Sequence, residues 1–148
     1  MQVLRKRALT RSEVMSRIKG RDTQPELVIR RLLFAAGWRF RVHYQTAGGR
    51  VDIAFPRLQV AILIDGCFWH GCRYHGVKPK TNVEFWSKKL LENRRRDRRQ
   101  RRKLGRLGWT VLRIWEHSVE RVPTEVSATL NKELTRKLRS QMVRGVSG

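Results

Sequence analysis

The chain has 148 residues, of which 40% are hydrophobic, and this is enough for one domain with a core of ordinary size. Its 34 Lys and Arg residues against 12 Asp and Glu give a formal net charge of +22, which favours a polyanionic partner, with nucleic acid the first candidate and an anionic membrane the second. The longest purely aliphatic run, residues 60–64, is too short for a membrane span and the first residues lack the apolar stretch of a signal peptide, so we expect a cytoplasmic protein.

The N-terminal part of the sequence predicts a basic arm followed by a helix. We interpret residues 1–20 as the arm. The helix is predicted to begin at Thr23, because Thr23 and Glu26 form a capping-box pattern and Pro25 suits a first turn. Gly37 is expected to end this helix.

The middle of the sequence predicts strands joined by turns. Residues 38–44 alternate like a strand, and "QTAGGR" (45–50) predicts a turn. A hairpin follows, in which "VDIAF" (51–55) and "VAILI" (60–64) flank a turn at residues 56–57. The second of these strands is apolar throughout, which indicates a buried central strand.

The last part of the sequence predicts a long helix, a strand and a terminal helix. The long helix covers residues 81–108 and again begins with a Thr-x-x-Glu pattern, the strand covers 109–115, and the terminal helix covers 123–144. This order of elements predicts an α/β domain with a mixed β-sheet flanked by helices. We assign residues 1–148 to this single domain, with 121–148 as its helical tail.

Two carboxylates are expected at one end of the hairpin. Asp52 lies early in the first hairpin strand and Asp65 directly follows the second, so a turn of about four residues places both near the same end of the ladder. Two such carboxylates can share Mg²⁺, a hard cation that can polarise a scissile phosphate. The alternative is that both make only local hydrogen bonds. Glu26 is a third candidate, although a capping box explains it without chemistry.

The segment "IDGCFWHGCRYH" (64–75) holds both cysteines and two of the four histidines of the chain. A closed structural zinc site needs four ligands, and the candidates are Cys67, Cys72, His75 and His117. The alternative is a buried free cysteine with surface histidines of no particular role. His70 is left outside this set, within reach of a metal at Asp65, and is a candidate general base or acid.

Aromatic and basic residues predict contacts with a nucleic acid. Phe68 and Trp69 are adjacent in a polar loop and Trp86 begins the long helix, and such rings can stack on bases or wedge between base pairs, with core packing as the alternative. The long helix is also dense in arginine, with a solvated helix face as the alternative to phosphate contacts. The candidates for DNA-backbone contacts are Arg94, Arg95, Arg98 and Arg99.

With these residues in place, the chain resembles the very short patch repair (Vsr) endonucleases, small bacterial enzymes that nick DNA beside a T:G mismatch left by deamination of 5-methylcytosine. The matching segments run in family order and are "MSRIKGRDTQPE" (15–26), "GRVDIAF" (49–55), "DGCFWHGCRYH" (65–75), "TNVEFWSKKL" (81–90), "NRRRDRR" (93–99) and "LGWTVLRIWEH" (107–117). The segment containing GCFWH is the most specific of these.

This resemblance implies a restriction-endonuclease-like core of the PD-(D/E)XK type that hydrolyses phosphodiesters with Mg²⁺. Asp52 falls on the family's metal-binding aspartate, and the backbone carbonyl of Ile64 falls where it can complete the metal shell. His70 matches the histidine that activates water, and Glu26 matches an acidic residue near the active site. Asp65 stands where some members have histidine.

The resemblance also implies the zinc ligands and a DNA wedge. Zinc (Zn²⁺) falls on Cys67, Cys72, His75 and His117. The residues that match the intercalating aromatics are Phe68, Trp69 and Trp86, and those that match a segment wedging from the other groove are Met15 and Ile18. Cys67 stands where restriction-type sites carry a lysine, so the missing base is His70 or a metal-bound water.

The leading hypothesis is therefore a strand-nicking DNA endonuclease directed to T:G mismatches, in which the aromatics act where pairing is already weak. A nuclease of the same core with a homing or restriction target is the first alternative. A non-catalytic zinc module that binds DNA is the second. We expect a monomer on double-stranded DNA, associated with the bacterial nucleoid, with mismatch-repair proteins as candidate partners and no membrane association.

Overall fold

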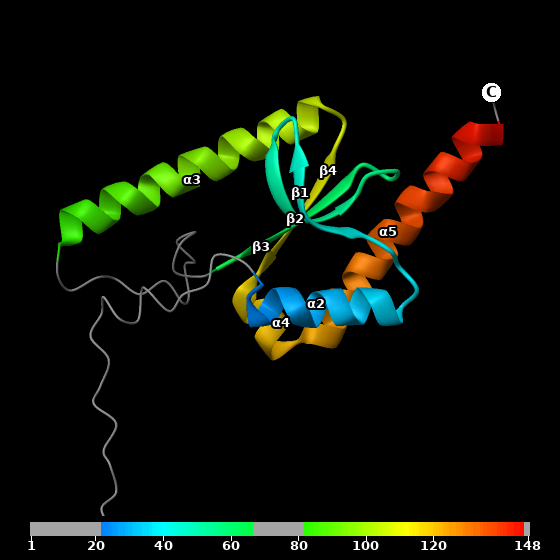
Figure 1. The fold of residues 1–148 in the computed structure, drawn as a ribbon, viewed down its shortest axis with the longest axis horizontal. Coiled ribbons are helices and arrows are strands. Elements are labelled where there is room, and N and C mark those ends of the chain that lie inside the picture. The colour runs from blue at the N-terminus through cyan, green and yellow to red at the C-terminus, as the bar shows by residue number, and fades with distance from the viewer. Residues whose placement is uncertain (1–21, 67–81, 147–148) are drawn as a thin grey trace, which may run out of the picture.

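A computed structural model describes residues 22–66 and 82–146, and Figure 1 shows their arrangement. The elements in chain order are α2 (Gln24–Ala35), β1 (Arg41–Thr46), β2 (Gly49–Phe55), β3 (Val60–Asp65), α3 (Val83–Arg106), β4 (Thr110–Trp115), α4 (Glu116–Arg121) and α5 (Pro123–Val146). The predicted order of elements is confirmed, with α4 as an addition, and the predicted basic arm lies outside the described residues. Within the described ranges, no helix is both long and apolar enough to cross a membrane.

The four strands form one sheet in the order β1-β2-β3-β4. β2 pairs antiparallel with both β1 and β3, whereas β3 and β4 pair in parallel. The predicted mixed sheet is therefore confirmed. A parallel pair needs a long crossover connection, and α3 forms part of the chain that connects β3 to β4.

The larger part of the core lies between the sheet and three helices, α2, α4 and α5, which gather on one side of it in Figure 1. Ile29 and Leu33 of α2 belong to the same buried cluster as Ile62 of β3 and Leu134 of α5, and all four are fully buried. The predicted terminal helix is confirmed, and it contributes side chains to this core.

Helix α3 contacts the opposite face of the sheet near its C-terminal end. Leu104 is fully buried there, and the Gln100 side-chain amide donates a hydrogen bond to the backbone carbonyl of Arg50 at 2.8 Å. The β1–β2 turn allows this close approach, because a Cβ atom on Gly48 would lie 2.9 Å from Cδ2 of Leu104. The N-terminal half of α3 extends away from the sheet (Figure 1).

Two local details differ from the sequence prediction, and a third agrees with it. β1 begins only at Arg41, because the Trp38 indole donates a hydrogen bond to Asn131 of α5 at 2.8 Å and packs against the core instead of joining the sheet. The Thr-x-x-Glu start predicted for the long helix is not its cap: Asn82 is the N-cap residue, with φ of 52° and no capping side-chain hydrogen bond. Gly37, with φ of 94°, follows α2 as predicted.

Candidate active site

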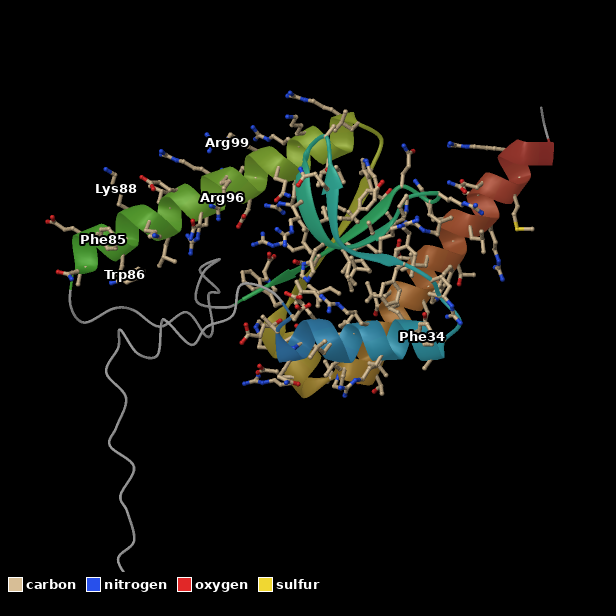
Figure 2. The ribbon with its side chains drawn as sticks, viewed as in Figure 1. Phe34, Phe85, Trp86, Lys88, Arg96 and Arg99 are labelled. Atoms are coloured by element: carbon tan, nitrogen blue, oxygen red, sulfur yellow. The ribbon has the colours of Figure 1, made fainter. Side chains whose placement is uncertain are left out.

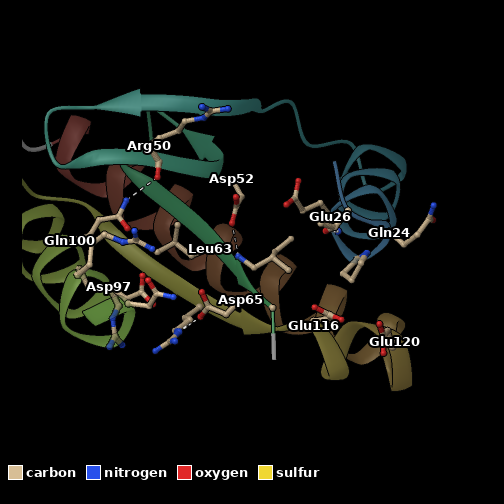
Figure 3. A pocket seen from close by; sticks show the side chains of 18 of the residues that line it. Gln24, Glu26, Arg50, Asp52, Leu63, Asp65, Asp97, Gln100, Glu116 and Glu120 are labelled. Atoms are coloured by element: carbon tan, nitrogen blue, oxygen red, sulfur yellow. Dashed lines mark hydrogen bonds and ion pairs between the residues drawn. The ribbon is translucent and has the colours of Figure 1, made fainter. Parts of the chain in front are cut away.

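A cavity of about 770 Å³ lies between the start of α2, the ends of β2 and β3, and the inner side of α3 (Figure 3). Its acidic lining residues include Glu26, Asp52, Asp65, Glu116 and Glu120. Its basic lining residues are Arg50, Lys89, Arg96, Arg101 and Arg113. The cavity thus brings the three predicted carboxylates together, opposite a cationic wall supplied largely by α3.

Asp52 is fixed at the point where β2 and β3 stop pairing. The register runs from Phe55 opposite Val60 to Ile53 opposite Ile62, and beyond it the Asp52 carboxylate accepts a hydrogen bond from the backbone N–H of Ile64 at 2.7 Å. The Asp52 carboxylate therefore satisfies the Ile64 N–H where the strand pairing ends, and it is held beside Ile64. The prediction that the hairpin brings residues 52 and 65 to the same end of the ladder is confirmed, since both line the cavity.

Glu26 is buried in the first turn of α2 and does more than cap it. Its backbone N–H reaches the Thr23 hydroxyl at 3.5 Å, while its carboxylate accepts from the Asp22 backbone N–H and from the Arg30 guanidinium, each at 3.0 Å. In Figure 3 the carboxylate points toward Asp52. Burial, and next the negative charge of Asp52, raise the pKa of Glu26 above its ordinary value.

Asp65 is buried at the end of β3 and forms an ion pair with Arg113 of β4. The guanidinium carbon of Arg113 also lies 4.8 Å from the centre of the Trp115 ring. Burial lowers the pKa of Arg113. The sequence did not point to Arg113, although an arginine inside the apolar strand "TVLRIW" was the signal that could have found it.

A second group of ligand-type side chains lies behind Glu26. One ligand atom from each of Asp22, Glu26 and His43 lies within 4.8 Å of the others. Arg30 already supplies a cation there, because it contacts Asp22 at 2.8 Å and the His43 ring at 3.2 Å. Hydrogen bonds from His43 and then Arg30 lower the pKa of Asp22 to about 2. This group is an ion-pair network that supports Glu26.

The basic residues of α3 occupy two sides of the helix. The predicted DNA-backbone residues Arg94, Arg95, Arg98 and Arg99 are all exposed. The cavity is lined instead by Lys89, Arg96 and Arg101, and Figure 2 shows Arg96 and Arg99 on different sides of the helix. Among the described residues, Nε of Arg101 is one of two buried side-chain polar atoms without a hydrogen-bond partner, which makes it a candidate donor to an anion.

Trp86 and His117 are the two described members of the predicted wedge and zinc site. Trp86 lies at the far end of α3 and contacts Phe85 edge-on, with ring centres 5.2 Å apart (Figure 2). The His117 ring stacks on Trp115, with centres 6.2 Å apart and an interplanar angle of 17°. The other predicted residues of these two sites, and His70, lie outside the described residues: Met15, Ile18, Cys67, Phe68, Trp69, Cys72 and His75.

Comparison with known proteins identifies the family. The model of the family "DNA mismatch endonuclease Vsr" matches residues 2–75. The chain belongs to the Vsr family. It is 43% identical over 112 residues to "Type II nicking enzyme V.NaeI" of Lentzea aerocolonigenes, which covers 72% of this chain and 68% of the relative. It is 41% identical over 108 residues to "DNA mismatch endonuclease Vsr" of Escherichia coli, which covers 72% of this chain and 69% of the relative.

A solved structure has the same type of fold. The catalytic domain of the homing endonuclease I-Bth0305I aligns with a TM-score of 0.50 at 20% sequence identity, over 78% of this chain and 98% of that domain. This likeness supports the predicted restriction-endonuclease-like core. The family and the relatives named as nicking or mismatch endonucleases show that this chain is a DNA endonuclease, and DNA is its partner.

Proposed function

We propose that this Vsr-family endonuclease uses Mg²⁺ to nick one DNA strand beside a T:G mismatch, and so initiates very short patch mismatch repair. The observation that carries the proposal is the cavity in which Asp52 and Glu26 face each other opposite a basic wall. The E. coli relative, named as a mismatch endonuclease, supports a mismatch as the target.

The donor atoms at the end of the hairpin fit Mg²⁺. The proposed ligands are the Asp52 carboxylate and the Ile64 carbonyl, which are hard oxygen donors of two residues that are joined by the hydrogen bond from the Ile64 N–H to Asp52. The repulsion that Asp52 exerts on Glu26 also marks a place where a divalent cation would be favourable. When bound, Mg²⁺ would polarise the scissile phosphate and stabilise the leaving oxygen.

We assign proton transfer and DNA binding to side chains of the protein. We assign the proton transfer from the attacking water to His70, with Glu26 as an acidic group that helps to orient that water. Arg96 and Arg101 on the inner side of α3 would hold the DNA backbone against the acidic wall. The exposed arginines on the other side of α3 would add affinity that is independent of sequence.

A zinc-bound loop next to the cavity is proposed to carry the DNA wedge. The proposed ligands are Cys67, Cys72, His75 and His117. The position of His117 in α4 supports this choice, because α4 directly follows Trp115, which pairs with Asp65 at the end of β3. The proposed wedge residues are Phe68, Trp69 and Trp86 from one groove and Met15 and Ile18 from the other. We also propose that the protein acts as a monomer, on DNA of the bacterial nucleoid.

A nicking assay tests this function against its alternatives. T:G and matched T:A duplexes, labelled on either strand, are incubated with and without Mg²⁺, and Asp52→Asn serves as a control of nearly unchanged volume. We expect the wild-type protein to cut one strand of the T:G duplex only, and only with Mg²⁺. Equal cutting of T:A duplexes, or cutting of both strands, would favour a same-fold nuclease with another target. Binding without cutting would favour a non-catalytic module.

A further inference from the structure

The ion pair between Asp65 and Arg113 brings a cation to the second acid of a site that lacks the restriction-type lysine. Such sites carry a second acid and, two residues later, a lysine, but here Cys67 stands at the lysine position. Arg113 comes from the neighbouring strand: it is the register partner of Leu63, two residues before Asp65 on the same face of β3. A cation from β4 therefore lies beside the second acid, in the same cavity as Asp52.

The guanidinium of Arg113 is held in one orientation by two contacts. Its Nε donates to the Asp65 carboxylate, and its plane lies over Trp115. Neither terminal nitrogen of Arg113 donates a hydrogen bond to another of the described residues. A guanidinium that is fixed through Nε and an aromatic ring presents its two terminal nitrogens as a preorganised fork, the geometry that binds phosphate oxygens in pairs.

We propose that Arg113 binds the scissile phosphate through its terminal nitrogens, and that Asp65 is the positioning residue for Arg113 and not a metal ligand. This inference rests on the proposed metal-dependent nicking at Asp52. Asp65 already faces the full positive charge of Arg113, which lowers its attraction for a divalent cation. The phosphate would then lie between the metal at Asp52 and the terminal nitrogens of Arg113. The positive charges of the metal and of Arg113 would both stabilise its oxygens.

The experiment measures whether Arg113 and one particular phosphate act together. The phosphate at which the wild-type protein nicks is mapped first, and a second duplex then carries a neutral methylphosphonate at that position. The affinity for both duplexes is measured by fluorescence anisotropy with Ca²⁺ in place of Mg²⁺, for wild type, Arg113→Gln and Arg113→Lys. Arg136→Gln is the matched control, because Arg136 also forms an ion pair, with Glu133, but on the exposed surface of α5.

The proposal predicts a loss that appears only when the phosphate is charged. Arg113→Gln should weaken binding to the native duplex by about 10- to 100-fold, but binding to the methylphosphonate duplex by no more than about twofold. Arg113→Lys should restore only part of the affinity, because an ammonium lacks the fork. If the methylphosphonate weakened wild type and Arg113→Gln by the same factor, Arg113 would be a core residue and the proposal would be wrong.

Folding is controlled by a second variant, because Arg113→Gln leaves the buried Asp65 carboxylate without its cation. The double variant Asp65→Asn/Arg113→Gln replaces the ion pair with two neutral amides that can bond to each other. It should melt cooperatively and show the same insensitivity to the methylphosphonate as Arg113→Gln. Retention of the wild-type phosphate dependence in the folded double variant would overturn the role of Arg113.

The role of Asp65 is decided without DNA or catalysis. Mn²⁺ binding to the zinc-loaded protein is measured by calorimetry for wild type, Asp52→Asn and Asp65→Asn. Asp52→Asn should lose measurable binding, whereas Asp65→Asn should stay within about twofold of wild type. A tenfold or greater loss in Asp65→Asn, on the order of one lost ligand, would make Asp65 a metal ligand and refute its positioning role.

The outcomes for Arg113 and for the proposed function are separable. If the wild-type protein nicks but the phosphate dependence is absent, only the role of Arg113 fails. If the wild-type protein nicks no duplex, the proposed function fails, and the phosphate in contact with Arg113 is sought by moving the methylphosphonate along the strand in the binding assay. An Arg113→Gln affinity that never depends on any single phosphate would overturn the inference in that case as well.

Discussion

Asp52→Asn separates the proposed catalytic role of the Asp52 carboxylate from its structural role. The Asp52 carboxylate accepts from the backbone N–H of Ile64 at 2.7 Å, where the β2–β3 ladder ends. An asparagine carbonyl oxygen can accept the same hydrogen bond, so the fold should be retained. The substitution also removes the negative charge that raises the pKa of Glu26, which offsets part of the loss of a charge-assisted bond.

The expected magnitudes follow from these contacts. Replacing a charge-assisted hydrogen bond by a neutral one costs about 1 kcal/mol, so Asp52→Asn should change the free energy of unfolding by no more than that. Asp52→Leu should cost about 1–3 kcal/mol more, because the Ile64 N–H would be buried without a partner. Nicking should fall by at least ~10³-fold in both variants, since several kcal/mol of transition-state stabilisation by the metal would be lost.

Urea unfolding followed by tryptophan fluorescence gives the stability of each variant, and a single-turnover nicking assay gives the rate. The wild-type protein and Asp52→Leu bracket the Asn variant in the first measurement. Nicking by Asp52→Asn within about tenfold of the wild-type rate would remove Asp52 from the metal site. An Asn variant as unstable as the Leu variant would show that the hydrogen bond to Ile64 is not what holds the end of the hairpin.

Other parts of the molecule give further predictions. Burial and the charge of Asp52 raise the pKa of Glu26, so ionising this residue destabilises the fold. Glu26→Gln should therefore match the wild-type melting temperature below the ordinary pKa of glutamate, and exceed it as pH rises through the raised pKa. A difference in melting temperature that stays constant across a pH series would contradict this. Arg101→Gln should weaken DNA binding more than Arg95→Gln, and lower the slope of log affinity against log salt by about one, in a salt titration. His117→Ala should reduce copurified zinc well below one equivalent by elemental analysis, and full zinc content would exclude it as a ligand. Leu134→Ala should lower the free energy of unfolding by about 2–5 kcal/mol in urea, because α5 contributes to the core.

The fold could be predicted largely from local signals. The apolar pattern of residues 51–55 and 60–64 predicts strands at these positions. The ends of α2 are marked by Thr23 and Pro25 at its start and by Gly37 after its end. The convergence of Asp52 and Asp65 followed from simple hairpin geometry. These features depend on residues close in sequence. Backbone preference and the spacing of apolar side chains decide them without contacts to distant segments.

The features that the sequence did not reveal depend on contacts between distant segments. Arg113 is a single charge in an apolar strand, and its partner Asp65 lies 48 residues away, so only the parallel register of β3 and β4 brings them together. The choice of cavity-facing arginines on α3 depends in the same way on how Leu104 docks the helix on the sheet. In an arginine-rich helix, the side that faces the site is set by this one apolar anchor and not by the charges.

The distribution of charge around the cavity suggests why this protein carries so large an excess of basic residues. The proposed catalytic acids, Asp52 and Glu26, line the cavity into which a DNA backbone would enter, and their negative charge repels a phosphate. The inner side of α3 and Arg113 supply fixed positive charge on the opposite wall, and a divalent cation at Asp52 would invert the charge on the acidic wall. Affinity from the arginines alone would hold DNA at many positions without placing a phosphate next to Asp52. Under the proposed function, productive binding would therefore require the metal and the basic wall together, and most of the positive charge would act before the chemical step, by bringing DNA to the cavity.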